Sequence, residues 1–244
     1  MADSHYRRIE LHLPFDEFLR LPRNSAYKYE YYDGRAVLSP RPKCHRAVLD
    51  LHPLTDVEPY EVRALPPGEI MDFAELFCAA FRRTPPYAAL DDEQALTVAR
   101  ECLEKTAGGG DGPVIGSACF QAFEKHFSYP VGAILITLLP AGIVDNWGSH
   151  TWKEPLPADA VERRLGCPHL TWIFVSPWVE RHGMGTALLA ASVTALMELG
   201  YTQLASTFLQ GNDSSTLWHW HNGFRLQPLH SAWRREMRES KKKE

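Results

Sequence analysis

Two glycines one residue apart, Gly183 and Gly185, stand where a predicted strand passes into a predicted helix. The strand is the β-branched and aromatic run at 170–175, and the helix is the run rich in alanine and leucine at 184–199. A helix N-terminus presents unpaired N–H groups and the positive end of the helix dipole, so it attracts anions. Because neither glycine carries a Cβ, backbone N–H groups here are open to close approach, and the turn predicts a site for a diphosphate.

The residues around the glycines exclude two other phosphate loops. A Walker loop needs a Lys-Ser or Lys-Thr pair, which is missing, and a dinucleotide-binding fingerprint needs a third glycine where Leu188 stands. A simple tight turn remains the alternative interpretation of the two glycines taken alone.

The wider spacing resembles the acyl-CoA motif of the GNAT superfamily of N-acetyltransferases. That motif runs V-x-P-x-x-(Arg/Gln)-x-x-G-x-(Gly/Ala), and Val175, Pro177, Gly183 and Gly185 match it. A second segment of the superfamily, N-x-x-(Ala/Ser)-x-x-(apolar)-Tyr-x-x-x-G-F, is similar to the stretch at 212–224. The residues in register there are Asn212, Ser215, Trp218, Gly223 and Phe224.

The resemblance implies direct transfer of an acetyl group from acetyl-CoA, as cosubstrate, to an amine, without a covalent enzyme intermediate. It also implies that a backbone N–H near Val175, at the end of the fourth strand, polarises the thioester carbonyl. The cofactor-binding positions carried over from the resemblance are Phe174, Val175, Arg181, His182, Gly183, Met184, Gly185, Thr186 and Asn212.

Two positions depart from the superfamily pattern. Glu180 stands where an Arg or Gln begins the diphosphate loop, and His219 stands where a Tyr precedes the Gly-Phe pair. In the superfamily that Tyr is thought to protonate the departing CoA thiolate, a task that an imidazolium can also perform. His219 is therefore predicted as a catalytic acid, with a hydrogen-bonded core histidine as the alternative.

A base is also required, because only the free amine attacks the thioester and an alkyl amine has a pKa of about 10. His169, at the entrance of the strand at 170–175, is predicted as this base. The long irregular stretch at 140–169 offers His150, Glu154 and Asp145 as alternatives. The acceptor is expected to be a small-molecule or peptide amine, and the sequence does not choose between them.

Composition narrows the class of protein. The 244 residues are 45% hydrophobic, and the net charge of -4 gives no electrostatic reason to expect nucleic acid. Five scattered cysteines without a CxxC pair predict neither a disulfide framework nor a metal site. The charged N-terminus lacks a signal-peptide core, and no apolar run is long enough to span a membrane, so a cytoplasmic protein is expected.

The chain is expected to fold as an α/β protein with a mixed central sheet of the acyl-CoA N-acyltransferase type and helices on both faces. An Asp33-Gly34 pair between two strand-like runs predicts a β-hairpin, to which the run at 45–54 would add a third strand. The predicted organisation is a hairpin extension at 1–57, the N-acetyltransferase domain at 58–234 and a basic disordered tail at 235–244.

Two other functions stay open. A catalytically silent acyl-CoA-binding or interaction protein on the same fold would account for Glu180 and His219. A nucleic-acid-processing protein is the third hypothesis, since the hairpin loosely resembles the opening strands of small restriction-endonuclease-like nucleases. The metal-binding Asp and Glu-x-Lys pattern of those nucleases is missing, and the net charge opposes nucleic-acid binding.

Overall fold

A computed structural model describes residues 8–23, 27–40, 44–55, 60–84, 87–125, 127–140, 152, 154–179, 182–210 and 212–227. Its strands are β1 (Ile9–His12), β2 (Tyr27–Tyr32), β3 (Arg35–Pro40), β4 (Cys44–Asp50), β5 (Glu61–Ala64), β6 (Phe120–Phe123), β7 (Gly132–Leu139), β8 (Cys167–Val175), β9 (Gln203–Leu209) and β10 (Arg225–Leu226). Its α-helices are α1 (Phe15–Arg20), α2 (Ala74–Phe81), α3 (Asp92–Ala107), α4 (Met184–Glu198) and α5 (Asp213–His221). Short 3-10 turns are η1 (Pro67–Phe73), η2 (Tyr87–Ala89) and η3 (Gly116–Ala118).

Seven of the strands form one mixed sheet in the order β10-β4-β9-β8-β7-β6-β5. Every neighbouring pair is antiparallel except β8 and β9, which run parallel. The connection between these two strands is α4, as a parallel pair requires. The mixed α/β sheet expected from the sequence is therefore confirmed.

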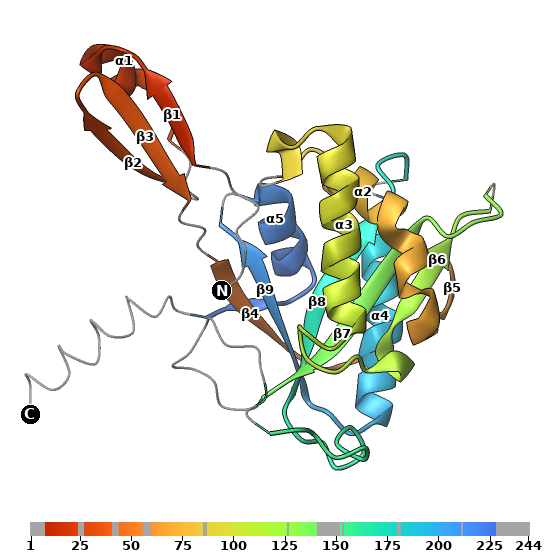
Figure 1. The fold of residues 1–244 in the computed structure, drawn as a ribbon. Helices are drawn as coiled ribbons and strands as arrows, with labels where there is room; N and C mark the ends of the chain where they lie inside the picture. The colour runs from red at the N-terminus through yellow and green to blue at the C-terminus, as the bar shows by residue number, and fades with distance from the viewer. Residues whose placement is uncertain are drawn as a thin grey trace, which may run out of the picture.

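Helices cover both faces of this sheet, which also confirms the expectation (Figure 1). On one face Phe77 of α2 contacts the rings of Trp172 and Phe174 on β8, and α3 packs beside α2. Figure 1 shows α3 in front of the sheet and α4 behind it. A β-bulge lies between β7 and β8, because Leu135 pairs with Trp172 and Ile136 with Leu170, which leaves Thr171 as the extra residue.

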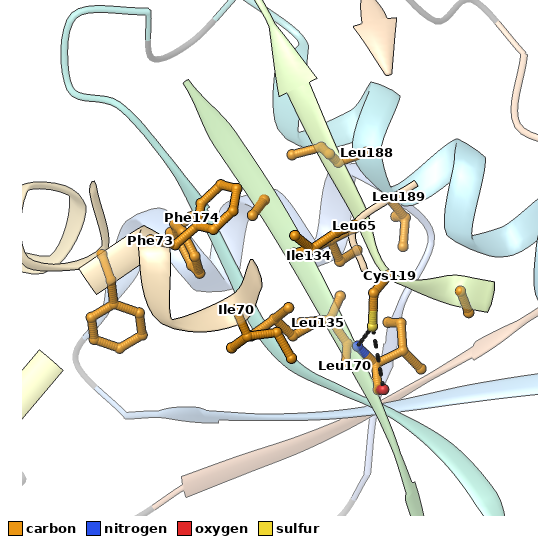
Figure 2. Close-up of a cluster of buried hydrophobic side chains, with 14 of the residues drawn as sticks. Leu65, Ile70, Phe73, Cys119, Ile134, Leu135, Leu170, Phe174, Leu188 and Leu189 are labelled. Carbon is orange, nitrogen blue, oxygen red and sulfur yellow. Dashed lines mark hydrogen bonds between the residues drawn. The ribbon is translucent and has the colours of Figure 1, made fainter. Parts of the chain in front are cut away.

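The core lies between the sheet and these helices. All eight residues of β7 are buried, which is why its sequence is a continuous apolar run rather than an alternating one. Figure 2 shows Ile134, Leu135 and Leu170 of the sheet packed among side chains from η1 and α4 and beside Cys119, the residue before β6. Within this cluster the Cys119 thiol is hydrogen-bonded to Ile136, and burial raises its pKa to about 11.

The N-terminal hairpin is present but differs from the expectation in its third strand. β2 and β3 pair across the Asp33-Gly34 turn, and β1 completes a three-stranded sheet in the order β1-β3-β2. This sheet has its own small core around Phe18, Ala36 and Leu38. The run expected to join the hairpin is instead β4, which pairs with β9 over seven residues. The predicted extension at 1–57 thus contains a strand of the seven-stranded sheet, because the backbone of β4 is hydrogen-bonded to β9.

A glycine beside the sheet gives a test of this packing. Gly112 has φ +91°, and a Cβ built on it would lie 2.4 Å from the Leu138 carbonyl oxygen. Gly109 in the same turn has φ +78° but nothing within 4 Å of the corresponding position. We expect Gly112→Ala to lower the free energy of unfolding by about 3 kcal/mol or more, because backbone cannot move aside.

The matched control is Gly109→Ala, which carries only the left-handed backbone penalty of about 1 to 2 kcal/mol. Urea denaturation of both variants measures the difference. Equal losses in the two variants would contradict the close approach at Gly112.

Candidate functional site

The parallel strands β8 and β9 pair at only two positions, His169 with Ala205 and Leu170 with Ser206. Both strands continue beyond these pairs, β8 to Val175 and β9 to Leu209. We call the diverging ends, 171–175 on β8 and 207–209 on β9, the β8–β9 splay. Its backbone groups are not used by pairing between the two strands, so they can serve a ligand lying along them.

The N-terminus of α4 follows β8 after one loop. Gly183 is the N-cap residue, with φ +84°, a conformation that favours glycine, and it has no side chain to accept from the first-turn N–H groups. The first turn of α4 carries no acidic residue. The Tyr60 hydroxyl donates to the His182 carbonyl oxygen at 2.6 Å, which ties the end of the loop to the residue before β5. This terminus therefore suits an anion.

Gly185 has a second reason to lack a side chain. A Cβ built on it would lie 3.0 Å from Nε1 of Trp218, which belongs to α5. The sequence associated Gly185 with the approach of a diphosphate. The structure adds that the half-buried Trp218 ring occupies the space a side chain would need.

The other predicted cofactor-binding positions lie around these elements. Phe174 is buried against Phe73 and Phe77, and its backbone pairs with Ala133 of β7. Met184 is also buried. Thr186 is half-buried in the first turn of α4. Asn212 caps α5, where its side-chain oxygen accepts from the Ser215 N–H at 3.0 Å.

His219 lies on α5 and is buried, with 2% of its surface exposed. Its Nδ1 is 2.7 Å from the Ser215 carbonyl oxygen, which can only accept, so Nδ1 carries the proton. Its Nε2 then accepts from the Ser206 hydroxyl at 2.8 Å, and its ring stacks on Phe208 at 4.1 Å between centroids. Burial lowers the pKa of His219 to about 4, and the Ser215 hydrogen bond offsets only part of this.

This geometry is that of a neutral core histidine, the alternative interpretation of the sequence, rather than that of a proton donor. A donor at neutral pH needs a proton that it holds loosely, whereas both nitrogens of His219 are engaged and its imidazolium form is disfavoured. The sequence could not distinguish the two roles, since both place a histidine on the inner face of a helix.

His169 lies on β8 at the vertex of the splay, with 6% of its surface exposed. Its Nδ1 is 3.0 Å from Thr171 Oγ1 on β8, and its Nε2 is 3.1 Å from Thr207 Oγ1 on β9. His169 thus links the two strands where they separate. It and His219 lie on opposite faces of the sheet, because Thr207 contacts the first and its neighbours Ser206 and Phe208 contact the second.

Some predicted residues fall outside the part of the chain that the structure describes. These are Glu180, Arg181, His150, Asp145 and the tail at 235–244. Glu154, the remaining alternative base, is described and exposed. Among the described residues no cluster of His, Cys, Asp or Glu is arranged to hold a metal ion. In those same residues no helix is both long and apolar enough to cross a bilayer.

The contact between Gly185 and Trp218 predicts that substitutions at the two positions are coupled. Gly185→Ala gains helix propensity but forces its Cβ against the indole ring, so it is expected to destabilise the wild-type chain. In a Trp218→Leu background the same change is expected to stabilise. Thermal or urea denaturation of the four chains should give a coupling energy of about 1 to 2 kcal/mol. Additive effects would mean that the ring is not held against α4.

The lowered pKa of His219 predicts a pH dependence of stability. In the unfolded chain this imidazole titrates near pH 6.5, so between about pH 6.5 and pH 4 the unfolded state binds the extra proton. We therefore expect acidification through this range to lower the free energy of unfolding by up to about 3 kcal/mol. His219→Gln should have a flatter profile over the same range by urea denaturation. Parallel profiles for the two chains would contradict a buried neutral histidine.

No protein-family model matches the chain, and no curated protein matches it significantly. Solved structures do match. The PaiA N-acetyltransferase from Thermoplasma acidophilum, solved in complex with coenzyme A, has 16% identity and a TM-score of 0.49, over 70% of this chain and 93% of that one.

A GCN5-related N-acetyltransferase from Sphaerobacter thermophilus has 13% identity and a TM-score of 0.47, over 90% of this chain and 56% of that one. An aminoglycoside N-acetyltransferase in complex with CoA has 16% identity and a TM-score of 0.41, over 72% of this chain and 95% of that one. Similarity at these levels assigns no activity to this chain. The chain is similar to solved N-acetyltransferases of the GNAT superfamily, the superfamily that its glycine motif resembles.

Proposed function

We propose that this protein transfers an acetyl group from acetyl-CoA to an amine. The observation that carries the proposal is the β8–β9 splay, which lies one loop away from the Gly183 N-cap of α4. The site offers a binding partner to each part of a ligand that has an anionic diphosphate at one end and an amide-rich arm at the other. The diphosphate would meet the first-turn N–H groups of α4, and the arm would meet the unused backbone groups of the splay.

Acetyl-CoA supplies the activated acyl group when it is bound. The chain's part in the reaction is to hold the thioester and the amine together, which removes the entropic cost of their encounter. A backbone N–H at the end of β8, near Val175, would polarise the thioester carbonyl. Direct transfer agrees with the state of Cys119, because a thiol with a pKa of about 11 is not a nucleophile at neutral pH.

A catalytically silent acyl-CoA-binding protein is the second candidate, and one observation favours it. His219 stands where the superfamily that this chain resembles has its proton-donating Tyr, yet it is buried, neutral and engaged at both nitrogens. A chain that binds acetyl-CoA but lacks a proton donor at this position would hold the thioester without efficient turnover.

Binding of acetyl-CoA is testable with a charge placed at the helix terminus. Isothermal titration of the wild-type chain with acetyl-CoA is expected to give micromolar affinity, and titration with ATP none. Thr186→Asp puts a carboxylate in the first turn of α4, where it repels a diphosphate, so acetyl-CoA affinity should fall at least about tenfold.

The matched control is Thr194→Asp, the same change at an exposed position of the same helix, which should leave the affinity unchanged. Aspartate in a first helical turn is not expected to destabilise the fold, so Thr186→Asp should keep the thermal stability of the wild type. A loss of affinity at unchanged stability would then be due to charge repulsion and not to unfolding. Equal affinities of Thr186→Asp and the wild type for acetyl-CoA would show that the diphosphate does not bind at the N-terminus of α4. Acetyl-CoA binding without acetylation of any member of an amine library would favour the silent candidate.

A further inference from the structure

We infer that the indole N–H of Trp218 donates a hydrogen bond to the diphosphate of acetyl-CoA, reaching it from α5 while the first turn of α4 holds the same anion. The inference deepens the proposed function and rests on it. Trp218 is half-buried, and its ring lies where three elements meet, namely α5, the start of α4 and the end of β8.

The position of the indole nitrogen follows from its distance to Gly185, the second residue of α4. The point at which a Cβ of Gly185 would lie is 3.0 Å from Nε1 of Trp218 and 3.8 Å from Cδ1 of Ile173. Ile173 is half-buried and belongs to the β8–β9 splay. Because a helical Cα–Cβ bond is tilted toward the N-terminus of its helix, this point lies on the N-terminal side of the Gly185 Cα. The indole N–H is therefore close to both parts of the candidate site.

This N–H group has no hydrogen-bond acceptor in the part of the chain that the structure describes. Trp218 makes ring contacts with His219 and Phe224, at 5.0 Å and 6.1 Å between centroids. The other half-buried tryptophans of the described residues both donate from Nε1 at 2.9 Å, Trp152 to the Leu138 carbonyl oxygen and Trp172 to Thr106 Oγ1. An indole N–H at this depth usually has an acceptor, so the acceptor of Trp218 is expected to come from a ligand.

The neighbouring groups favour an anion as this acceptor. The N–H groups of Met184, Gly185 and Thr186 have no acceptor inside α4, and Gly183 has no side chain that could cap them. Nε1–H of Trp218 is thus a donor beside other donors, at the positive end of a helix dipole. A phosphate group offers several oxygens to such donors, and hydrogen bonds to a charged acceptor are the stronger ones.

A purely structural role for Trp218 makes a different prediction. If the side chain only packs α5 against α4, its ring is required and its N–H group is not. If it binds the diphosphate, the N–H group itself contributes to affinity, and only for ligands that carry a phosphate. Trp218→Phe separates the two roles, because it keeps an aromatic ring on α5 and removes the donor.

Isothermal titration of the whole chain with acetyl-CoA is the first test. We expect Trp218→Phe to bind acetyl-CoA about tenfold more weakly than the wild type, because a hydrogen bond to a charged acceptor is lost. The matched control is Trp220→Phe, the same change at an exposed position of the same helix, which should bind acetyl-CoA like the wild type. Thermal denaturation checks that each variant is folded at the temperature of the titration.

The wild-type chain gives a second measurement, which decides the question even if Trp218→Phe does not fold. In a ¹H–¹⁵N spectrum the indole proton of Trp218 should move downfield when acetyl-CoA or inorganic pyrophosphate is added, since each supplies a phosphate acceptor. S-acetyl-pantetheine, which has the arm and the thioester but no phosphate, should leave this resonance in place. An equal shift with S-acetyl-pantetheine, or no shift with acetyl-CoA, would overturn the inference.

The inference and the proposed function fail in different ways. If the wild type does not bind acetyl-CoA, the proposed function fails and the role of Trp218 fails with it. If the wild type binds acetyl-CoA and folded Trp218→Phe binds it equally well, only the present inference is lost, and Trp218 is a packing residue between α4 and α5.

Discussion

The limited pairing of β8 with β9 is the constraint on which the rest of the site depends. Parallel strands that paired along their full length would consume the backbone donors and acceptors between them. Here the pairing covers two positions, and then the strands separate. The helix that joins them, α4, begins near the end of β8, so its N-terminus and the unused backbone lie one loop apart.

The bulge in β8 adds to this arrangement. The extra residue, Thr171, lies one position beyond the last paired residue, Leu170. Trp172 and Thr171 both make hydrogen bonds toward the α3 face, Trp172 to Thr106 and Thr171 to Thr137. An unbulged strand would alternate these side chains between the two faces. Since regular alternation already places Thr171 on the face of His169, the bulge is what brings Trp172 to that face as well.

The two predicted catalytic histidines are both buried and hydrogen-bonded, but to different partners. For His219 the Ser215 carbonyl oxygen, which can only accept, settles that Nδ1 carries the proton. His219 directs its remaining nitrogen to a buried serine and stacks on Phe208. His169 directs Nε2 across the splay to a half-buried threonine. The partners of the two ring nitrogens therefore differ between the histidines, although both side chains are buried.

Much of the fold was accessible from the sequence because it depends on local patterns. The glycine turn and the hairpin at Asp33-Gly34 are each encoded by neighbouring residues, and each is present. The strand with which β4 pairs could not be predicted from the sequence, because strand pairing depends on residues that are far apart in the chain. Its pairing with β9 joins residues more than 150 positions apart.

The same division holds for the candidate site. The sequence by itself predicted a glycine turn at the start of a helix and identified both histidines as candidate site residues. Only the tertiary structure decided that Trp218 fills the space beside Gly185, that His219 is neutral, and that His169 lies between Thr171 of β8 and Thr207 of β9. The physical reason is that a turn is fixed by the conformational preferences of a few adjacent residues, whereas protonation and tautomer are fixed by burial and by partners that other strands and helices bring.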